Sequence, residues 1–99
     1  MKPSFLIEPE AELELEDAAR WYNSERNGLG HELILAVEEV FDNIRRNPEI
    51  YGIVCDDIRY ARTIRFPYGV FYKIEYDGIV VLSIRHGSRN PGWWQSRSS

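Results

Sequence analysis

The sequence predicts an α+β domain in which a helical hairpin packs on a mostly antiparallel four-stranded sheet, in the order β-α-α-β-β-β. Three observations predict it: helical periodicity is confined to residues 10–46, a glycine-rich break interrupts it once, and the other apolar segments are short and bounded by turn residues. With 99 residues, 43% of them hydrophobic, the chain has the length of one domain and can build a core. We therefore expect residues 1–99 to form a single domain, with a mobile tail from about residue 95, where the sequence has no pattern.

A change of period near Pro9 separates the first strand from the first helix. The apolar run Phe5-Leu6-Ile7 is typical of a short strand, and Pro9 suits the first turn of a helix. The residues that follow recur with helical spacing and predict one buried stripe. This stripe consists of Ala11, Leu15, Ala18, Ala19 and Tyr22. The acidic residues expected to face outward are Glu12, Glu14 and Glu16.

A second helix is predicted after the glycine-rich break at residues 27–30, which permits a tight reversal. Its buried stripe is expected to contain Leu33, Val37, Val40, Phe41 and Ile44. Asn47-Pro48 ends it, because the residue before a proline disfavours helical backbone. The short connection makes the two helices antiparallel neighbours, and residues 47–57 are expected to form the longest loop.

Three strands are predicted after this loop. They cover residues 58–66, 70–76 and 79–86. Asp77-Gly78 favours a two-residue hairpin turn, which would pair Tyr76 with Ile79. The first of the three strands has arginines on both faces, which is typical of an edge strand. The last strand is apolar on both faces, which favours an interior position in the sheet.

The charge of the chain is divided between its two parts. Residues 1–57 carry five Lys/Arg and 14 Asp/Glu, a net charge of −9, whereas residues 58–99 carry seven and two, a net charge of +5. The overall charge of −4 therefore belongs to a polarised molecule whose basic part is rich in aromatic residues. An anionic partner is expected to dock there. The candidate partner-binding residues are Arg62, Arg65, Arg85, Arg89, Trp93 and Trp94.

Each of these residues also has a purely structural interpretation. Arginines on an exposed strand prevent edge-to-edge association, and one of two adjacent tryptophans is expected to pack in the core. His86, at a strand end, is typical of a locally hydrogen-bonded histidine. A general acid/base role for His86 is a hypothesis because Arg89 and the tryptophans follow it closely.

Several other kinds of chemistry lack support in the sequence. The single cysteine, Cys55, excludes an intrachain disulfide, and the widely spaced His31 and His86 do not predict a zinc site. The pair Gly28-x-Gly30 lies between helices and so is no dinucleotide-binding loop. No apolar run approaches the roughly 18–20 residues of a membrane span, and no signal-peptide pattern is present. We expect a cytoplasmic protein with no metal, no cofactor and no membrane contact.

Five short motifs extend along nearly the whole chain. They are Ala19-x-Trp21-Tyr22, Gly28-Leu29-Gly30, Asn47-Pro48, Arg65-Phe66-Pro67-Tyr68 and His86-x-x-Arg89-x-Pro91-x-x-Trp94. In this order and at this spacing, the chain resembles the RelE/ParE superfamily of toxins from type II toxin–antitoxin modules. The resemblance implies the same β-α-α-β-β-β fold, a growth-inhibiting activity and a cognate antitoxin that wraps the toxin.

Within this superfamily the chain is more similar to the ParE-like branch, which is associated with plasmid stabilisation and, in some members, with DNA gyrase inhibition. The RelE-like branch cleaves messenger RNA on the ribosome. It carries basic residues at positions that match Gly69 and Gly87, and a tyrosine at the position of Trp93. The resemblance therefore implies a toxin that binds a protein target. The alternatives are an mRNA endonuclease and an inactive relative that retains the fold. A nuclease would use as catalytic residues His86, Arg62 and Arg89.

Overall fold

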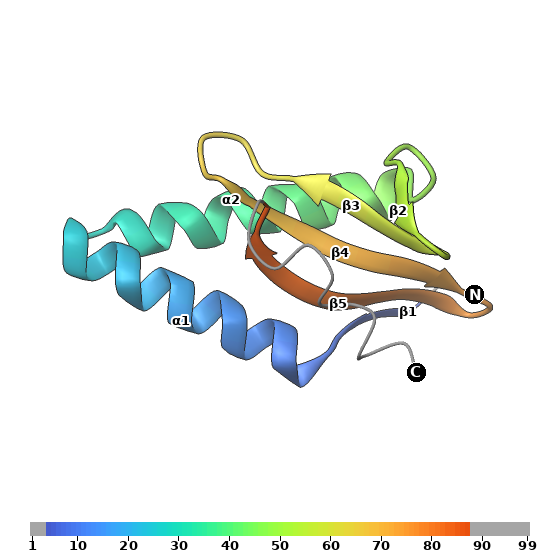
Figure 1. The fold of residues 1–99 in the computed structure, drawn as a ribbon, viewed down its shortest axis with the longest axis horizontal. Coiled ribbons are helices and arrows are strands. Elements are labelled where there is room, and N and C mark those ends of the chain that lie inside the picture. Colours follow the sequence, from blue (N-terminus) through green and yellow to red (C-terminus); the bar gives the residue numbers. More distant parts are fainter. Residues whose placement is uncertain (1–3, 88–99) are drawn as a thin grey trace.

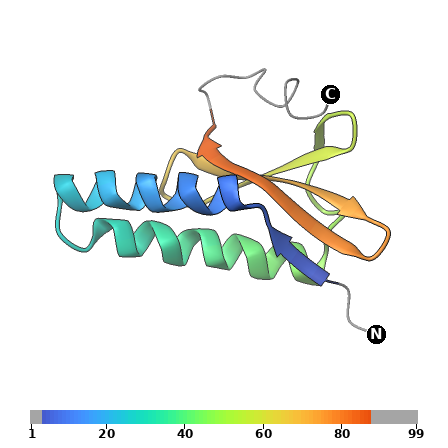
Figure 2. The same cartoon turned by 90° about the horizontal axis from the view of Figure 1, so that it is seen from below.

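The computed structural model, which describes residues 4–87, has two helices on one face of a five-stranded mixed sheet (Figures 1 and 2). The elements are β1 (Ser4–Ile7), α1 (Pro9–Glu25), α2 (Leu29–Arg46), β2 (Ile53–Cys55), β3 (Ile58–Arg62), β4 (Tyr68–Glu75) and β5 (Gly78–His86). The strand order is β1-β5-β4-β3-β2, in which β1 pairs with β5 in parallel and all other pairs are antiparallel. The predicted fold class is confirmed, with five strands instead of four.

The helical hairpin closes tightly at its turn. Gly28 adopts a left-handed backbone (φ 90°), and the side-chain oxygen of Asn23 accepts a hydrogen bond from the Gly30 amide at 2.8 Å. A Cβ atom at Gly30 would lie 2.1 Å from the carbonyl oxygen of Ala19, so only glycine permits this approach of the two helices. All five predicted stripe residues of α2 are buried, which confirms the helical period.

The core lies between the hairpin and the sheet. Its fully buried sheet residues include Val70, Tyr72 and Val81, which face Leu33 and Val37 of α2 within one hydrophobic cluster. Burying an aliphatic side chain of this size contributes about 1.5–3 kcal/mol, so this layer dominates the stability of the fold. The view in Figure 2 shows both helices on the same side of the sheet.

The segment expected to be one long loop contains the short strand β2. Because β2 pairs with β3, the edge position predicted for β3 is wrong, and β2 is the edge strand. The remainder of the loop is held by two side chains from the sheet. Arg59 donates a hydrogen bond to the Tyr51 carbonyl oxygen at 2.6 Å, and the Tyr72 hydroxyl donates one to the Pro48 carbonyl oxygen at 2.6 Å. Three residues are too few to produce a recognisable alternation of apolar and polar positions.

β3 ends at Arg62 and not at Phe66, as the sequence had suggested. The reason is Thr63, whose buried hydroxyl lies 3.0 Å from both the Phe66 and the Tyr68 carbonyl oxygens and so closes a loop over residues 63–67. Phe66 packs into the core from this loop, where it is 5% exposed.

The β4–β5 hairpin differs in register from the prediction. Gly78 pairs with Glu75, so the pairing of Tyr76 with Ile79 is wrong. A Cβ atom at Gly78 would lie 2.2 Å from the Ser4 carbonyl oxygen, so a side chain at this position would prevent β1 from approaching β5 this closely. Farther along, a bulge inserts one extra residue of β5. The pairs on its two sides are Tyr72↔Val81 and Phe71↔Ser83. Such a shift depends on tertiary contacts and leaves no local sequence pattern.

Candidate partner-binding surface

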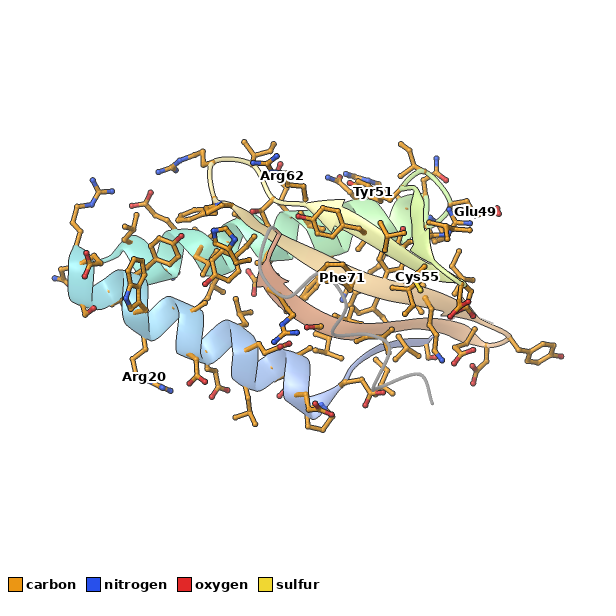
Figure 3. The ribbon with its side chains drawn as sticks, in the orientation of Figure 1. Arg20, Glu49, Tyr51, Cys55, Arg62 and Phe71 are labelled. Atoms are coloured by element: carbon orange, nitrogen blue, oxygen red, sulfur yellow. The ribbon has the colours of Figure 1, made fainter. Side chains whose placement is uncertain are left out.

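Two of the predicted arginines lie in one row across the sheet. Arg62 pairs with Gly69, and Gly69 pairs with Arg85, so the two arginines flank a glycine on neighbouring strands. Cross-strand partners share a face, and this row lies opposite the helices because the neighbouring Val70 belongs to the core. We call this side of the sheet the outer face; Arg62 is labelled at the end of β3 in Figure 3.

Arg65 is displaced from this row into the loop that follows β3. It adopts a positive φ of 77°, and its guanidinium lies 2.7 Å from the carboxylate of Glu32 on α2. This hydrogen bond from Arg65 is the main reason that the pKa of Glu32 lies below its ordinary value. Arg65 remains 62% exposed, so it is held in place by Glu32 without being covered.

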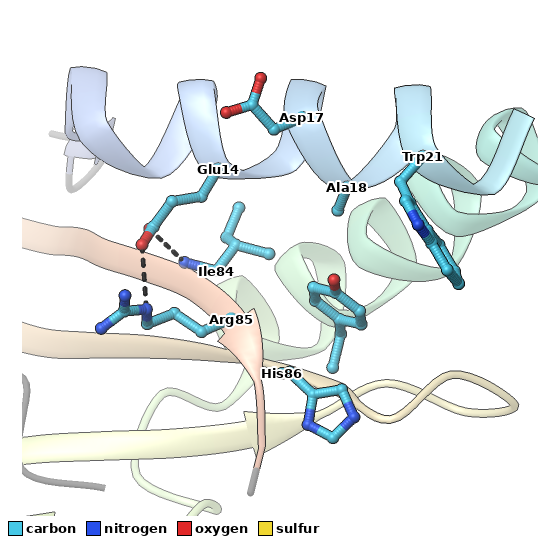
Figure 4. A pocket seen from close by; sticks show the side chains of 8 residues that line it. Glu14, Asp17, Ala18, Trp21, Ile84, Arg85 and His86 are labelled. Carbon is cyan, nitrogen blue, oxygen red and sulfur yellow. Dashed lines mark hydrogen bonds and ion pairs between the residues drawn. The ribbon is translucent and has the colours of Figure 1, made fainter. Parts of the chain in front are cut away.

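Arg85 belongs to a network around Glu14 that the sequence did not reveal. β1 pairs no farther than Val81, and the Glu14 carboxylate of α1 reaches β5 just beyond that point. Its Oε1 accepts hydrogen bonds from the Ile84 amide at 3.1 Å and the Ser83 hydroxyl at 2.6 Å, while its Oε2 lies 3.1 Å from Arg85 Nε (Figure 4). The outward orientation expected for Glu14 is wrong. This carboxylate joins α1 to the bulged part of β5 and protects a strand edge.

A pocket of about 340 Å³ opens beside this network, between α1 and the ends of β4 and β5 (Figure 4). Its lining consists of Glu14, Asp17, Ala18, Trp21, Tyr68, Ile84, Arg85 and His86. His86 pairs with Tyr68, and the two rings are 5.7 Å apart. Because side chains alternate along a strand, His86 points to the helix side of the sheet whereas Arg62 lies on the outer face. These two members of the hypothetical catalytic set therefore lie on opposite faces.

Tyr60 is the residue of the outer face that sequence reasoning missed. Its ring covers two glycines: an added Cβ would lie 2.0 Å from Tyr60 Cε1 at Gly69 and 2.5 Å from the Tyr60 hydroxyl at Gly87. The ring also packs on Phe71, with centroids 4.8 Å apart. Burial raises the pKa of Tyr60, and the charge of Arg62 acts in the opposite direction. Only the cross-strand register brings Tyr60 to these glycines, so no motif could have indicated it.

Metal binding and membrane spanning also lack support in residues 4–87. Within that range, no cluster of three or more His, Cys, Asp or Glu is arranged to bind a metal ion, and neither helix is long and apolar enough to cross a membrane. The predicted site residues Arg89, Trp93 and Trp94 lie outside the described residues.

The architecture is similar to that of a known protein. The structure is similar to a solved structure described as the chromosomal ParDE TA system from P. aeruginosa, with a TM-score of 0.66 over 86% of this chain and 96% of that chain. Sequence identity is 13%, so this likeness shows a shared fold alone. A comparison with curated protein sequences gave no match.

The sequence then establishes the family. Residues 5–91 match the family model described as the ParE toxin of the type II toxin–antitoxin system parDE. The chain belongs to the ParE toxin family and is the toxin component of a type II toxin–antitoxin system. Membership of this family implies an antitoxin partner.

Proposed function

We propose that this chain, folded as one domain over residues 1–99, is a cytoplasmic growth inhibitor that acts by binding a protein target and is neutralised by its cognate antitoxin. The family match over residues 5–91 carries the toxin assignment. Binding without RNA cleavage is supported by Tyr60, whose ring fills the space above Gly69 and Gly87. A nuclease of the related branch would need basic side chains at those two positions.

DNA gyrase is the proposed target. Induction of the toxin alone should arrest growth and raise a DNA damage response, and the purified protein should inhibit supercoiling by purified gyrase. Arrest without either effect would remove gyrase as the target, and absence of arrest would favour an inactive relative that retains the fold.

The antitoxin is proposed to place an anionic segment at the basic end of the sheet, near Arg62, Arg65, Arg85 and Arg89, with Trp93 and Trp94 contributing apolar contact. Two observations support this: Arg62 is exposed, and Arg65 is 62% exposed in a fixed position. Opposite charges at such a surface mainly accelerate association and give it salt dependence. Reversing Arg62 and Arg65 to glutamate should weaken the complex and flatten its salt dependence.

A matched control for these charge reversals is Arg20→Glu. Arg20 is also exposed but lies on α1, away from the basic surface, and pairs only with Asp17 among the described residues. Equal affinity for the double variant, Arg20→Glu and the wild type at low and high salt would exclude the arginine surface as the antitoxin site.

The second candidate function is ribosome-dependent mRNA cleavage, for which Arg62 matches a basic position and His86 is the available acid or base. The placement of these residues on opposite faces speaks against it. Loss of one electrostatic contact to the transition state typically lowers a rate by about 10²–10³. We expect little cleavage in a ribosome-programmed assay. Efficient cleavage that collapses in His86→Ala would establish the nuclease instead.

A further inference from the structure

Three residues at and just after the end of β3 occupy alternate positions along the chain. Tyr60 and Arg62 share that face because they are two residues apart on one strand, and Ile64 follows them in the adjoining loop, where it is 70% exposed. We propose that this Tyr60–Arg62–Ile64 ridge is the surface that contacts the cellular target of the toxin. The proposal rests on the proposed function, because it assigns a surface to the target of a protein-binding toxin.

The ridge is rigid at its Tyr60 end. The phenol ring lies on the backbone of Gly69 and Gly87, where any side chain would collide with it, and it packs on Phe71 from the side. A ring fixed in this way loses little conformational entropy when a partner binds, which favours affinity. Tyrosine also gives a large apolar contact area together with a polar tip.

The ridge is equally rigid at its Ile64 end. The loop is closed by the two contacts of the Thr63 hydroxyl, and Phe66 anchors it in the core against the ring of Tyr22 at 5.2 Å. Arg65 adopts a left-handed backbone and forms an ion pair with Glu32. A non-glycine residue in this conformation persists only where its surroundings impose it, and such positions concentrate at functional sites. This loop presents one large aliphatic side chain, Ile64, to solvent.

Arg62 supplies a charge between these two apolar groups. It is exposed and forms no ion pair with any other residue in the range 4–87, in contrast to Arg65 and Arg85. An arginine available between a tyrosine and an isoleucine has the composition of an interface hot spot. The complementary partner is a protein surface that offers a carboxylate between two apolar depressions.

A protein partner fits this ridge better than a nucleic acid does. Tight binding to a nucleic acid usually requires several arginines or lysines on neighbouring phosphates. The ridge offers one such charge, and the neighbouring Arg65 and Arg85 are each paired with a glutamate. The apolar side chain of Ile64 cannot bind a phosphate, but its burial in an apolar depression of a protein surface would be favourable. The ridge therefore favours a protein target.

The decisive variant is Ile64→Asp, which changes an exposed side chain and should leave folding intact, as a thermal melt would verify. Its matched control is Ile50→Asp, since Ile50 is 64% exposed on the loop before β2 and is not part of the ridge. Each variant is induced alone to score growth arrest, and is also coexpressed with the cognate antitoxin to score complex formation. We expect Ile64→Asp to raise the toxin level needed for arrest by about tenfold or more, as for a hot-spot residue. The antitoxin complex should persist, and Ile50→Asp should behave as the wild type.

Four results would overturn the assignment. Arrest by Ile64→Asp at the wild-type toxin level would exclude the ridge from target binding. Arg62 is shared with the proposed antitoxin site, so the complex tests Ile64: its loss in Ile64→Asp would assign Ile64 to the antitoxin instead of the target. Degradation of messenger RNA during wild-type arrest, abolished in Ile64→Asp, would assign it to RNA. A wild-type protein that causes no arrest would remove the proposed function itself and the ridge with it, an outcome recognised from the wild-type culture alone.

Discussion

The helix side and the outer face of the sheet each depend on a glycine, but the group that lies against the glycine differs. An added Cβ would lie 2.1 Å from the Ala19 carbonyl oxygen at Gly30, and 2.0 Å from a ring carbon of Tyr60 at Gly69. The first neighbour is helical backbone, which moves only if the two helices separate. The second is a side chain that can rotate away. Similar distances therefore predict different consequences: loss of stability on the helix side, and rearrangement of the surface on the outer face.

The largest effect is expected for Gly30→Ala. Overpacking typically costs about 1–3 kcal/mol, and here the obstructing atom belongs to backbone, so a free energy of unfolding lower by about 2–3 kcal/mol is expected even though alanine favours helix. Gly52→Ala is the matched control, because nothing lies within 4 Å of its added Cβ, and should change stability by less than about 0.5 kcal/mol. Urea unfolding measures both. Equal stability of the two variants would show that the hairpin can open at no cost.

The second effect tests the outer face. Gly69→Ala should displace the Tyr60 ring and lower the free energy of unfolding by about 1–1.5 kcal/mol, less than Gly30→Ala because the ring can rotate. Burial raises the pKa of Tyr60, so exposure of the ring should bring this pKa back toward its ordinary value. NMR titration of the Tyr60 ring reports it separately from the other five tyrosines. A Tyr60 pKa unchanged in Gly69→Ala would mean that the position of the ring does not depend on the absence of a side chain at Gly69.

The same difference explains what the sequence could predict. All five predicted stripe residues of α2 are buried, because burial of one helix face imposes a period of 3.6 on the sequence, whereas Glu14 of α1 does not face outward as predicted. Asn47-Pro48 and the glycine-rich turn fixed the helix ends for local reasons as well. Each of these signals lies within a few residues of the structure that it specifies.

The outer face depends on contacts between distant segments, which no local pattern encodes. Tyr60 reaches Gly87 only through two strand registers, and Glu14 reaches Ile84 only because β1 stops at Val81. The β5 bulge also displaced the register expected from the turn. The arginines were recognised as candidates from composition. Their pairing could be known only from the fold: Arg65 and Arg85 each pair with a glutamate, whereas Arg62 forms no ion pair within residues 4–87.

The third prediction has a smaller expected effect on stability and concerns the hydroxyl of Tyr72, on the helix side of the sheet. Tyr72→Phe removes the hydrogen bond to the Pro48 carbonyl oxygen, which should lower the free energy of unfolding by about 1 kcal/mol at pH 7. Burial raises the pKa of Tyr72 to about 12. Because the folded-state pKa is raised, the associated stability is present below the unfolded value near pH 10 and is lost as the pH rises toward 12.

The measurement for Tyr72 is unfolding as a function of pH from 7 to 12. The wild type should lose stability between pH 10 and 12 more steeply than Tyr72→Phe does. Tyr76→Phe is the control, because Tyr76 is fully exposed and should keep the wild-type slope. Identical slopes for the wild type and Tyr72→Phe would mean that the alkaline loss arises at other groups.

The smallest effect concerns the ion pair between Glu32 of α2 and Arg65, which lies in the loop after β3. Glu32→Gln should cost little stability, since exposed ion pairs contribute weakly and are screened by salt. The ion pair depresses the pKa of Glu32, so its contribution is present above the ordinary pKa of the carboxyl group and disappears as the pH falls through the lowered one. Thermal melts of the variant and the wild type should therefore differ slightly at neutral pH and low salt and converge in acid or in high salt. If the ridge loop depends on this pair for its conformation, Glu32→Gln should also weaken growth arrest more than it lowers the melting temperature. A variant that arrests growth fully would show that Thr63 and Phe66 suffice to hold the loop.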